Sequence, residues 1–109
     1  MKMIIETPNI KARKSLLDFV HEKVGKLEHL SDRIIEARVY LKVDKSDVTK
    51  NKVCEVKIVI PGDDLFASTQ SNSFEDAVQQ TVAALKHRIE RWKNSNNKKL
   101  HETITPPQL

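Results

Sequence analysis

Residues 35–43 decide the fold, and they read IEARVYLKV. Apolar and polar side chains alternate along this whole stretch. Successive side chains of a β-strand point to opposite faces of the sheet, so the alternation predicts a strand with one buried and one solvent-facing side. The polar residues 44–51 follow as a loop, and residues 54–60 (CEVKIVI) then repeat the alternation. These segments predict two neighbouring antiparallel strands.

Two further strands extend this pair in both directions along the chain. Residues 61–63 (PGD) are a strong turn signal, and residues 65–70 then place Leu65 and Ala67 on one face and Phe66 on the other. Near the start, residues 2–7 form a short apolar segment that ends before Pro8, which cannot donate to a strand ladder. The sequence therefore predicts a sheet of four strands.

Two helices are predicted between and after these strands. Over residues 11–30 the apolar side chains recur at helical spacing, and we expect Gly25 to weaken this helix without ending it. A second helix is expected from Phe74 to about Lys93, with Ser73 as its N-cap and the sequence NSNN at residues 94–97 as its end. Its apolar stripe consists of Phe74, Ala77, Val78, Thr81, Leu85, Ile89 and Trp92, with Val82 beside them.

The order strand, helix, three strands, helix predicts an α+β fold. In this two-layer sandwich, β-α-β-β-β-α, both helices cover one face of a four-stranded sheet. If the first two strands are parallel neighbours, the connection between them is a right-handed crossover. We expect residues 1–95 to form a single domain and residues 96–109 to form a flexible polar tail.

The composition is that of an ordinary soluble domain, with 39% hydrophobic and 31% charged residues in 109. A single cysteine cannot form an internal disulfide, and no apolar run approaches the roughly 20 residues of a membrane span. Because the N-terminus also lacks the features of a secretory signal, we expect a cytoplasmic protein with no membrane partner.

No catalytic arrangement is present in the sequence. The four histidines lack metal-ligand spacing, there is no glycine-rich phosphate loop, and Cys54 falls on the core-facing side of its strand, where thiols are usually inert. We therefore expect no enzyme activity, cofactor, metal or small-molecule substrate.

Positive charge is concentrated in one short segment. The net charge is +4, and residues 1–84 sum to zero, whereas residues 85–100 carry six basic side chains and one acid. Such a cluster attracts phosphate backbones, but it also complements the dipole at a helix C-terminus and aids solubility, and composition leaves both readings open. The cluster consists of Lys86, Arg88, Arg91, Lys93, Lys98 and Lys99, with His87 among them.

Other candidate contacts lie outside this cluster. Lys23 and Lys26 share one flank of the first helix, where an ordinary solvated surface is the alternative. Tyr40 and Phe66 on the outer face of the sheet faintly resemble a platform for stacking bases, although cross-strand packing explains an exposed tyrosine more often. Trp92 is assigned to the end of the core stripe.

The ordered set of motifs resembles the ribosome hibernation-promoting factors, also called ribosome-associated translation inhibitors. Coverage extends from about residue 2 to residue 95. The matching segments are residues 19–28 (FVHEKVGKLE), 32–34 (DRI), 40–43 (YLKV), 51–53 (NKV), 55–58 (EVKI), 60–67 (IPGDDLFA), 77–78 (AV) and 85–93 (LKHRIERWK).

This resemblance implies a fold similar to double-stranded RNA-binding domains. It also implies binding to rRNA in the small-subunit channel of mRNA and tRNA, which blocks translation and stabilises inactive ribosomes. We expect a short form of the family that is monomeric off the ribosome. The implied RNA contacts are Lys23, Lys26, His87, Arg91 and Lys93, with Lys86 and Arg88 beside them; Ala84 and Arg13 depart from the residues common in the family.

Two alternatives remain open from the sequence. The same fold and charge would suit a general binder of structured RNA that is not restricted to ribosomes. A protein-interaction module would instead self-associate through the open face of the sheet, using Tyr40, Val59 and Phe66.

Overall fold

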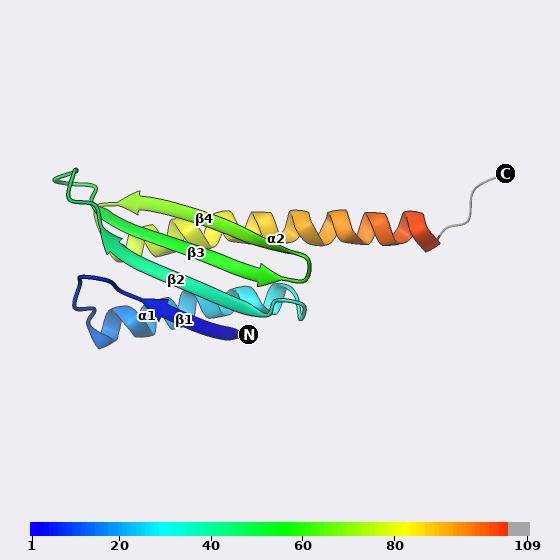
Figure 1. Ribbon diagram of the computed structural model, residues 1–109, viewed down its shortest axis with the longest axis horizontal. Helices are drawn as coiled ribbons and strands as arrows, with labels where there is room; N and C mark the ends of the chain where they lie inside the picture. The colour runs from blue at the N-terminus through cyan, green and yellow to red at the C-terminus, as the bar shows by residue number, and fades with distance from the viewer. Residues whose placement is uncertain (105–109) are drawn as a thin grey trace.

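The computed structural model describes the backbone of residues 1–104 and the side chains of residues 1–95. Strand β1 leads into a helical segment, three consecutive strands follow, and a long helix comes last (Figure 1). The elements are β1 (Lys2–Glu6), α1 (Lys14–Gly25), the 3-10 helix η1 (Lys26–Leu30), β2 (Glu36–Val43), β3 (Lys52–Ile60), β4 (Asp63–Ser71) and α2 (Phe74–Ile104).

The four strands lie in the order β1-β2-β3-β4. β1 pairs with β2 in parallel, and the other two pairs are antiparallel. The register places Ile5, Val39, Val56 and Ala67 in one row across the sheet, and the last three of these are buried. The predicted α+β fold and the alternation of the strands are therefore confirmed.

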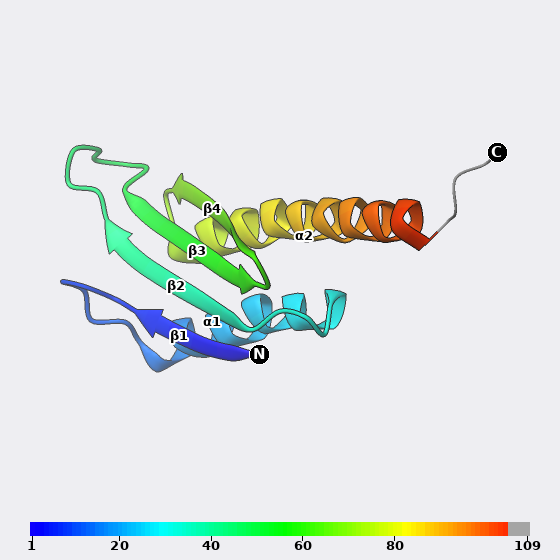
Figure 2. The ribbon, with the colours of Figure 1, turned by 45° about the vertical axis from the view of Figure 1, so that its right-hand side comes forward.

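Both helices lie behind the sheet, on the same face (Figures 1 and 2). α2 packs on β3 and β4, while α1 lies beside α2 and contacts β1. Between the layers is a core that contains the predicted stripes of both helices. Its buried members include Leu16, Val20, Val24, Leu27, Ala37, Val39, Leu41, Cys54, Val56, Ile58, Ala77, Val78, Leu85 and Ile89.

The first helix differs from its prediction at both ends. It begins at Lys14, because Arg13 has an extended backbone (φ −71°, ψ 151°). It also ends as an α-helix at Gly25, where a helix without an interruption was predicted, and continues as η1 with the tighter 3-10 geometry. Glycine has a low helix propensity, and 3-10 turns are common at α-helix ends, which accounts for the change.

The predicted end of the second helix was wrong. α2 continues through residues 94–97 and reaches Ile104. Asn and Ser are only moderately unfavourable in a helix, and the chain has no Gly or Pro between Phe74 and Pro106 to interrupt it. The first nine residues of the expected tail therefore belong to α2. Its flexibility stays a prediction, and residues 105–109 lie outside the described part of the chain.

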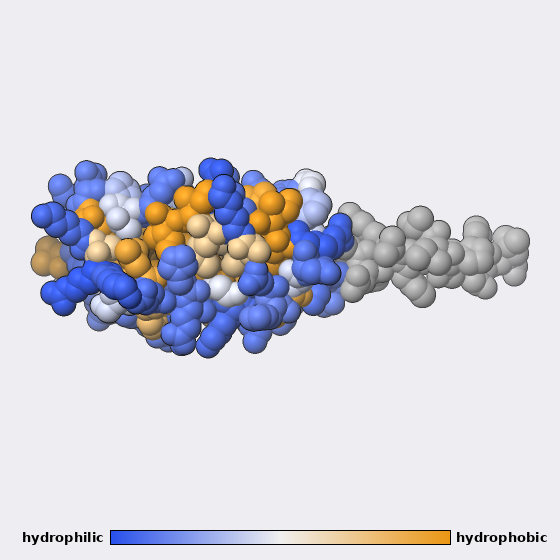
Figure 3. Space-filling view, turned by 90° about the horizontal axis from the view of Figure 1, so that it is seen from below, coloured by the Kyte–Doolittle hydropathy of each residue, from blue (hydrophilic) through white to orange (hydrophobic). Residues whose placement is uncertain are grey.

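β1 forms one edge of the sheet, and its central residues Met3, Ile4 and Ile5 are only half-buried. Figure 3 views the molecule from the side of β1 and α1 and shows apolar atoms in the middle of this face, bordered by hydrophilic atoms. Among the described residues, no helix combines the length and the apolar character needed to cross a bilayer.

Candidate nucleic-acid interface

All seven predicted RNA contacts lie on the helical layer. Two of them belong to the first helical segment, and five belong to the C-terminal half of the described side chains of α2. Lys26, Lys86, His87, Arg88 and Arg91 are exposed, and Lys23 and Lys93 are half-buried. The fold therefore brings the two predicted groups onto one layer, because α1 and η1 both pack against α2.

Lys23 lies on the flank of the first helical segment that points away from β1, and Lys26 follows three residues later, close to one helical turn. The opposite flank faces β1, because a Cβ atom placed on Gly25 would lie 4.0 Å from the Met3 side chain. Lys23 precedes Gly25 by two residues and so points to the other side. Its Nζ atom lies 5.5 Å from the centre of the Phe19 ring, which holds the ammonium group beside a half-buried aromatic surface.

The basic side chains of α2 divide between its two flanks. Lys93 lines an open pocket of about 390 Å³ with residues 29–33 and Trp92, so it faces η1 and the loop that follows it. Lys86 comes seven residues earlier, close to two helical turns, and therefore shares this flank. Lys23, Lys26, Lys86 and Lys93 thus border the space between the two helical segments, and we call them the interhelical lysines.

Arg88 and Arg91 lie on the other flank of α2, which faces the β3–β4 turn. Both line a second open pocket, of about 650 Å³, with Trp92 and the turn residues 61–63. The Arg88 guanidinium donates a hydrogen bond to the backbone oxygen of Phe66 in β4. His87 is exposed on the outer side of the helix, between the two flanks. The seven residues therefore do not form a single patch.

Arg33 also lines this pocket, although the sequence did not predict it as a contact. Its guanidinium carbon lies 5.2 Å from the centre of the Trp92 ring. We call Arg33, Arg88, Arg91 and Trp92 the arginine pocket. The only signal in the sequence was the matching motif at residues 32–34, because a loop residue has no periodicity that reveals its neighbours.

The predicted contact residues of the helical layer carry uncompensated charges. None of the seven predicted residues, nor Arg33, takes part in an ion pair within the described side chains. The ion pairs are Met1–Glu28, Lys14–Asp18, Arg38–Glu36, Lys42–Glu55 and Lys57–Asp64. The N-terminal ammonium group of Met1 lowers the pKa of Glu28 on the β1 side of η1.

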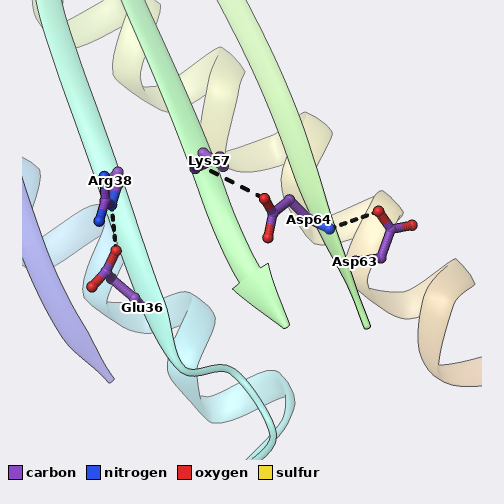
Figure 4. A network of polar contacts seen from close by, with 5 residues as sticks. All are labelled: Glu36, Arg38, Lys57, Asp63 and Asp64. Carbon is purple, nitrogen blue, oxygen red and sulfur yellow. Dashed lines mark hydrogen bonds and ion pairs between the residues drawn. The ribbon is translucent and has the colours of Figure 1, made fainter. Parts of the chain in front are cut away.

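The outer face of the sheet has the opposite character. Arg38 pairs with Glu36, and Lys57 lies 3.9 Å from Asp64 (Figure 4), while Lys42 lies 3.1 Å from Glu55. Hydrogen bonding to Arg38 lowers the pKa of Glu36, so this carboxylate stays charged and neutralises its partner. Each of these three cations is therefore neutralised by a neighbouring acid, which leaves this face poorly suited to binding phosphates.

The two aromatic residues of the outer face are not brought together. Tyr40 lies on β2 and Phe66 on β4, with β3 between them. Neighbouring strands are about 4.8 Å apart, so β2 and β4 are about 10 Å apart. The register also places Tyr40 opposite Glu55 and Phe66 opposite Lys57, in different rows of the sheet. They do not form one stacking platform, and Trp92 packs against the core as predicted, although one side of it reaches Arg33.

The remaining reactive group lies in the core. Cys54 is buried, and this burial raises the pKa of its thiol to about 11. A thiol that stays protonated at neutral pH is a poor nucleophile. Within the described side chains, no three His, Cys, Asp or Glu residues gather in a way that could hold a metal ion.

Two sequence relatives match most or all of this chain, but the chain spans only about half of the length of the first. The chain is 27% identical over 111 residues to the "Ribosome hibernation promotion factor" of Bacillus subtilis (strain 168), and it spans 57% of that protein. It is also 27% identical over 94 residues to the "Ribosome hibernation promoting factor" of Klebsiella oxytoca, where the match covers 86% of this chain and 95% of the relative.

Solved structures confirm the fold. A ribosomal subunit interface protein from Coxiella burnetii superimposes with a TM-score of 0.77 at 15% identity, covering 86% of this chain and 99% of that one. The N-terminal domain of Protein Y from Thermus thermophilus gives 0.71 at 20% identity, covering 84% and 99%. Residues 3–97 match the family described as "Sigma 54 modulation protein / S30EA ribosomal protein". Because this match covers most of the chain, the chain belongs to the Sigma 54 modulation protein / S30EA ribosomal protein family.

Proposed function

We propose that this protein is a ribosome hibernation factor, which binds rRNA of the small ribosomal subunit in the channel used by mRNA and tRNA. Bound there, it blocks translation and stabilises inactive ribosomes. Two relatives that are named ribosome hibernation factors support this role, and so does the fold shared with a protein named as a ribosomal subunit interface protein.

One observation carries the proposal for the binding surface. The seven predicted contact residues of the helical layer form no ion pair among the described side chains, although Lys14 at the start of α1 pairs with Asp18. On the sheet, by contrast, Arg38, Lys42 and Lys57 are all paired with acids. Binding to RNA gains free energy when cations displace the counterions of phosphates, and a cation already paired with a carboxylate contributes less. The helical layer is therefore the surface that we assign to rRNA.

Inhibition in this proposal comes from occupancy alone. The interhelical lysines, His87, Arg88 and Arg91 lie on elements fixed by a shared core, so the domain presents a preformed surface and loses little conformational entropy on binding. A domain that fills the channel by shape and charge competes with mRNA and tRNA without chemistry. We accordingly propose a non-enzymatic cytoplasmic protein that is monomeric off the ribosome.

Co-sedimentation with purified small subunits, combined with translation in vitro, tests the proposal. We expect the protein to pellet with small subunits at low salt, to be released as salt rises, and to inhibit translation at stoichiometric amounts. Excess mRNA and tRNA should reduce the bound fraction if the site is the decoding channel. Failure both to pellet and to inhibit at low salt would rule the function out.

A general binder of structured RNA is the second candidate, because uncompensated lysines attract any phosphate backbone. Competition between small subunits and an arbitrary RNA duplex separates the two functions. A ribosome factor should stay on the subunit even when the duplex contributes more phosphate groups than the subunit does. Equal affinity for both partners would favour the general binder.

A further inference from the structure

Strand β1 forms an open edge of the sheet. The backbone nitrogen of Lys2 donates to the backbone oxygen of Ile35 over 3.2 Å, so the backbone groups of Lys2 face β2. The backbone groups of successive residues in a strand point to alternate sides, so every second residue after Lys2 also faces β2. The N–H and C=O groups of Met3 and Ile5 therefore point outward. Among the described residues, neither makes a hydrogen bond outside the ladder with β2.

Little protects this edge from a further strand. Proteins commonly cover a sheet edge or place proline, a bulge or an inward-pointing charge there, because unpaired backbone groups are a template for pairing. At the opposite edge, β4 lies beside the arginine pocket, where Arg88 donates to the backbone oxygen of Phe66. β1 contains no proline, and its three central residues are apolar and only half-buried. Apolar atoms accordingly lie in the middle of the molecular face that contains this edge (Figure 3).

The sequence of β1, KMIIE at residues 2–6, is complementary to itself when two copies run antiparallel. A two-fold axis at Ile4 places Met3 opposite the partner's Ile5, so the outward backbone groups of these two residues exchange both of their hydrogen bonds. The same register places Lys2 opposite the partner's Glu6. Because the symmetry repeats each pair, two pairs of opposite charge flank a central pair of isoleucines.

The side chains that meet in this register also match. Ile5 shares a row with the buried Val39 and points to the core, so Lys2, Ile4 and Glu6 point to the outer face. Lys2 and Glu6 are exposed, and neither forms an ion pair within the described side chains. Opposite charges on neighbouring strands attract, whereas parallel pairing in register would place like charges opposite each other. The charges of β1 therefore favour the antiparallel arrangement.

We propose that β1 is an interaction surface for a second copy of this chain, which pairs with it antiparallel and joins the two four-stranded sheets into one. A pair of five-residue strands is much smaller than the interface of about 1,200–2,000 Å² found in stable complexes. The dimer is therefore weak, so the chain is monomeric in dilute solution and pairs when copies are concentrated. The contact uses the sheet edge and none of the interhelical lysines, so it goes beyond the proposed binding of rRNA and does not depend on it.

Sedimentation equilibrium of the full chain from about 1 μM to about 1 mM, the range of weak affinities, measures this dimerisation. We expect the average mass to rise from that of the monomer toward twice that value. Lys2→Glu and Glu6→Lys should each weaken dimerisation about tenfold at low salt, because each turns two attractive charge pairs into two repulsive ones. Lys2→Glu combined with Glu6→Lys should restore it, because the double variant exchanges the charges within each pair.

Net charge provides an internal control, because Lys2→Glu lowers the net charge of +4 by two and Glu6→Lys raises it by two. General repulsion between copies would therefore change in opposite directions, whereas the proposed pairing is weakened by both variants. Lys45→Glu in the exposed β2–β3 loop matches the charge change of Lys2→Glu away from β1 and should not weaken dimerisation. Thermal unfolding establishes that each variant is folded at the temperature of the measurement.

An equimolar mixture of the two single variants should dimerise like the wild type, because one carries two acids on β1 and the other carries two bases. A monomer mass at every concentration would overturn the proposal and leave this edge to a strand of a different protein. A dimer that is unaffected by the charge changes on β1 would overturn it as well, since the copies would then meet through another surface, such as the outer face of the sheet.

Discussion

The side chain of Thr81 in α2 lies against Cys54 in β3, with its Oγ1 atom 3.3 Å from the Cys54 backbone oxygen. Both residues are completely buried. The same hydroxyl lies 2.8 Å from the backbone oxygen of Ala77, one helical turn earlier, and its single hydrogen serves these two acceptors. This is a polar contact between the helical layer and the sheet at the centre of the core.

Thr81→Val should destabilise the fold by about 1 kcal/mol, because it keeps the shape of the side chain but removes a buried hydrogen-bond donor. Urea unfolding measures the free-energy change. Thr81→Ser is the complementary variant, which keeps the hydroxyl and removes a methyl group. A valine variant as stable as the wild type would mean that the hydroxyl contributes nothing to the attachment of α2 to β3.

The Cys54 thiol should make stability depend on pH in the alkaline range. Burial raises the thiol pKa from 9.0 to about 11, so between these values the unfolded chain loses the proton while the folded chain keeps it. The contribution of this thiol to stability is therefore fully present below pH 9 and is lost as the pH rises toward 11. Urea unfolding at a series of pH values checks this slope.

Cys54→Ala serves as the control for this slope, because it removes the thiol and leaves every other ionisable group in place. The alanine variant should be less stable at every pH but should lose less stability between pH 9 and 11. Identical slopes for the two proteins would contradict the assignment. In the native wild type, we also expect a thiol reagent at pH 8 to react only as fast as the protein unfolds.

The same substitution should have opposite effects at the two glycines. Gly25 has a right-handed helical backbone (φ −59°), and an added Cβ atom meets nothing closer than 4.0 Å, so Gly25→Ala should stabilise by about 0.5–1 kcal/mol. Gly62 follows Pro61 in the two-residue β3–β4 turn with φ +81°, so Gly62→Ala should destabilise by about 1–2 kcal/mol. Thermal unfolding of both variants tests the two signs, and equal signs would contradict these backbone assignments.

Arg13 should be a site where one substitution stabilises α1. It occupies the N-cap position with an extended backbone, makes no capping hydrogen bond, and has no acid in the following turn. Arg13→Ser should supply a capping oxygen and gain about 1 kcal/mol, or roughly 4–8 °C in Tm for a domain of this size. Arg13→Gln removes the charge without a good cap, so a serine variant no more stable than the glutamine variant would show that charge alone matters.

Periodicity predicted the elements well and their ends poorly. The alternation at residues 35–43 was sufficient to place Val39 inside and Tyr40 outside, because the side-chain direction in a strand depends only on position. The end of α2 was wrong because residues 94–97 resemble a loop in composition although nothing there prevents a helix. Helix ends depend on small differences in propensity that neighbouring residues can override.

The candidate site was predicted in part. Spacing alone could have separated Lys86 and Lys93 from Arg88 and Arg91, since seven residues return to the same side of a helix and three nearly do. Arg33 could not be found this way. Its contact with Trp92 depends on the path of the chain between η1 and β2, so only the tertiary fold brings the side chain to α2.

Neutralising charge on the helical layer should weaken binding to small subunits, whereas the same change elsewhere should not. Lys23→Gln with Lys26→Gln removes two interhelical lysines. Lys45→Gln with Lys50→Gln removes two exposed lysines from the β2–β3 loop, which lies at the end of the sheet opposite the C-terminal end of α2 (Figure 1). The salt dependence of the affinity, measured by co-sedimentation, reports the number of counterions released on binding. This number should fall by about 1–2 for the first pair and stay unchanged for the second.

The comparison separates a specific surface from overall charge, because both double variants have the same net charge. If the domain bound ribosomes only as a cation, the two pairs would weaken binding equally and lower the salt dependence equally. A larger effect of the loop pair would move the contact surface to the opposite end of the sheet. A loss confined to the pair at Lys23 and Lys26 requires that these side chains approach phosphates closely, since counterion release falls off beyond about 10 Å.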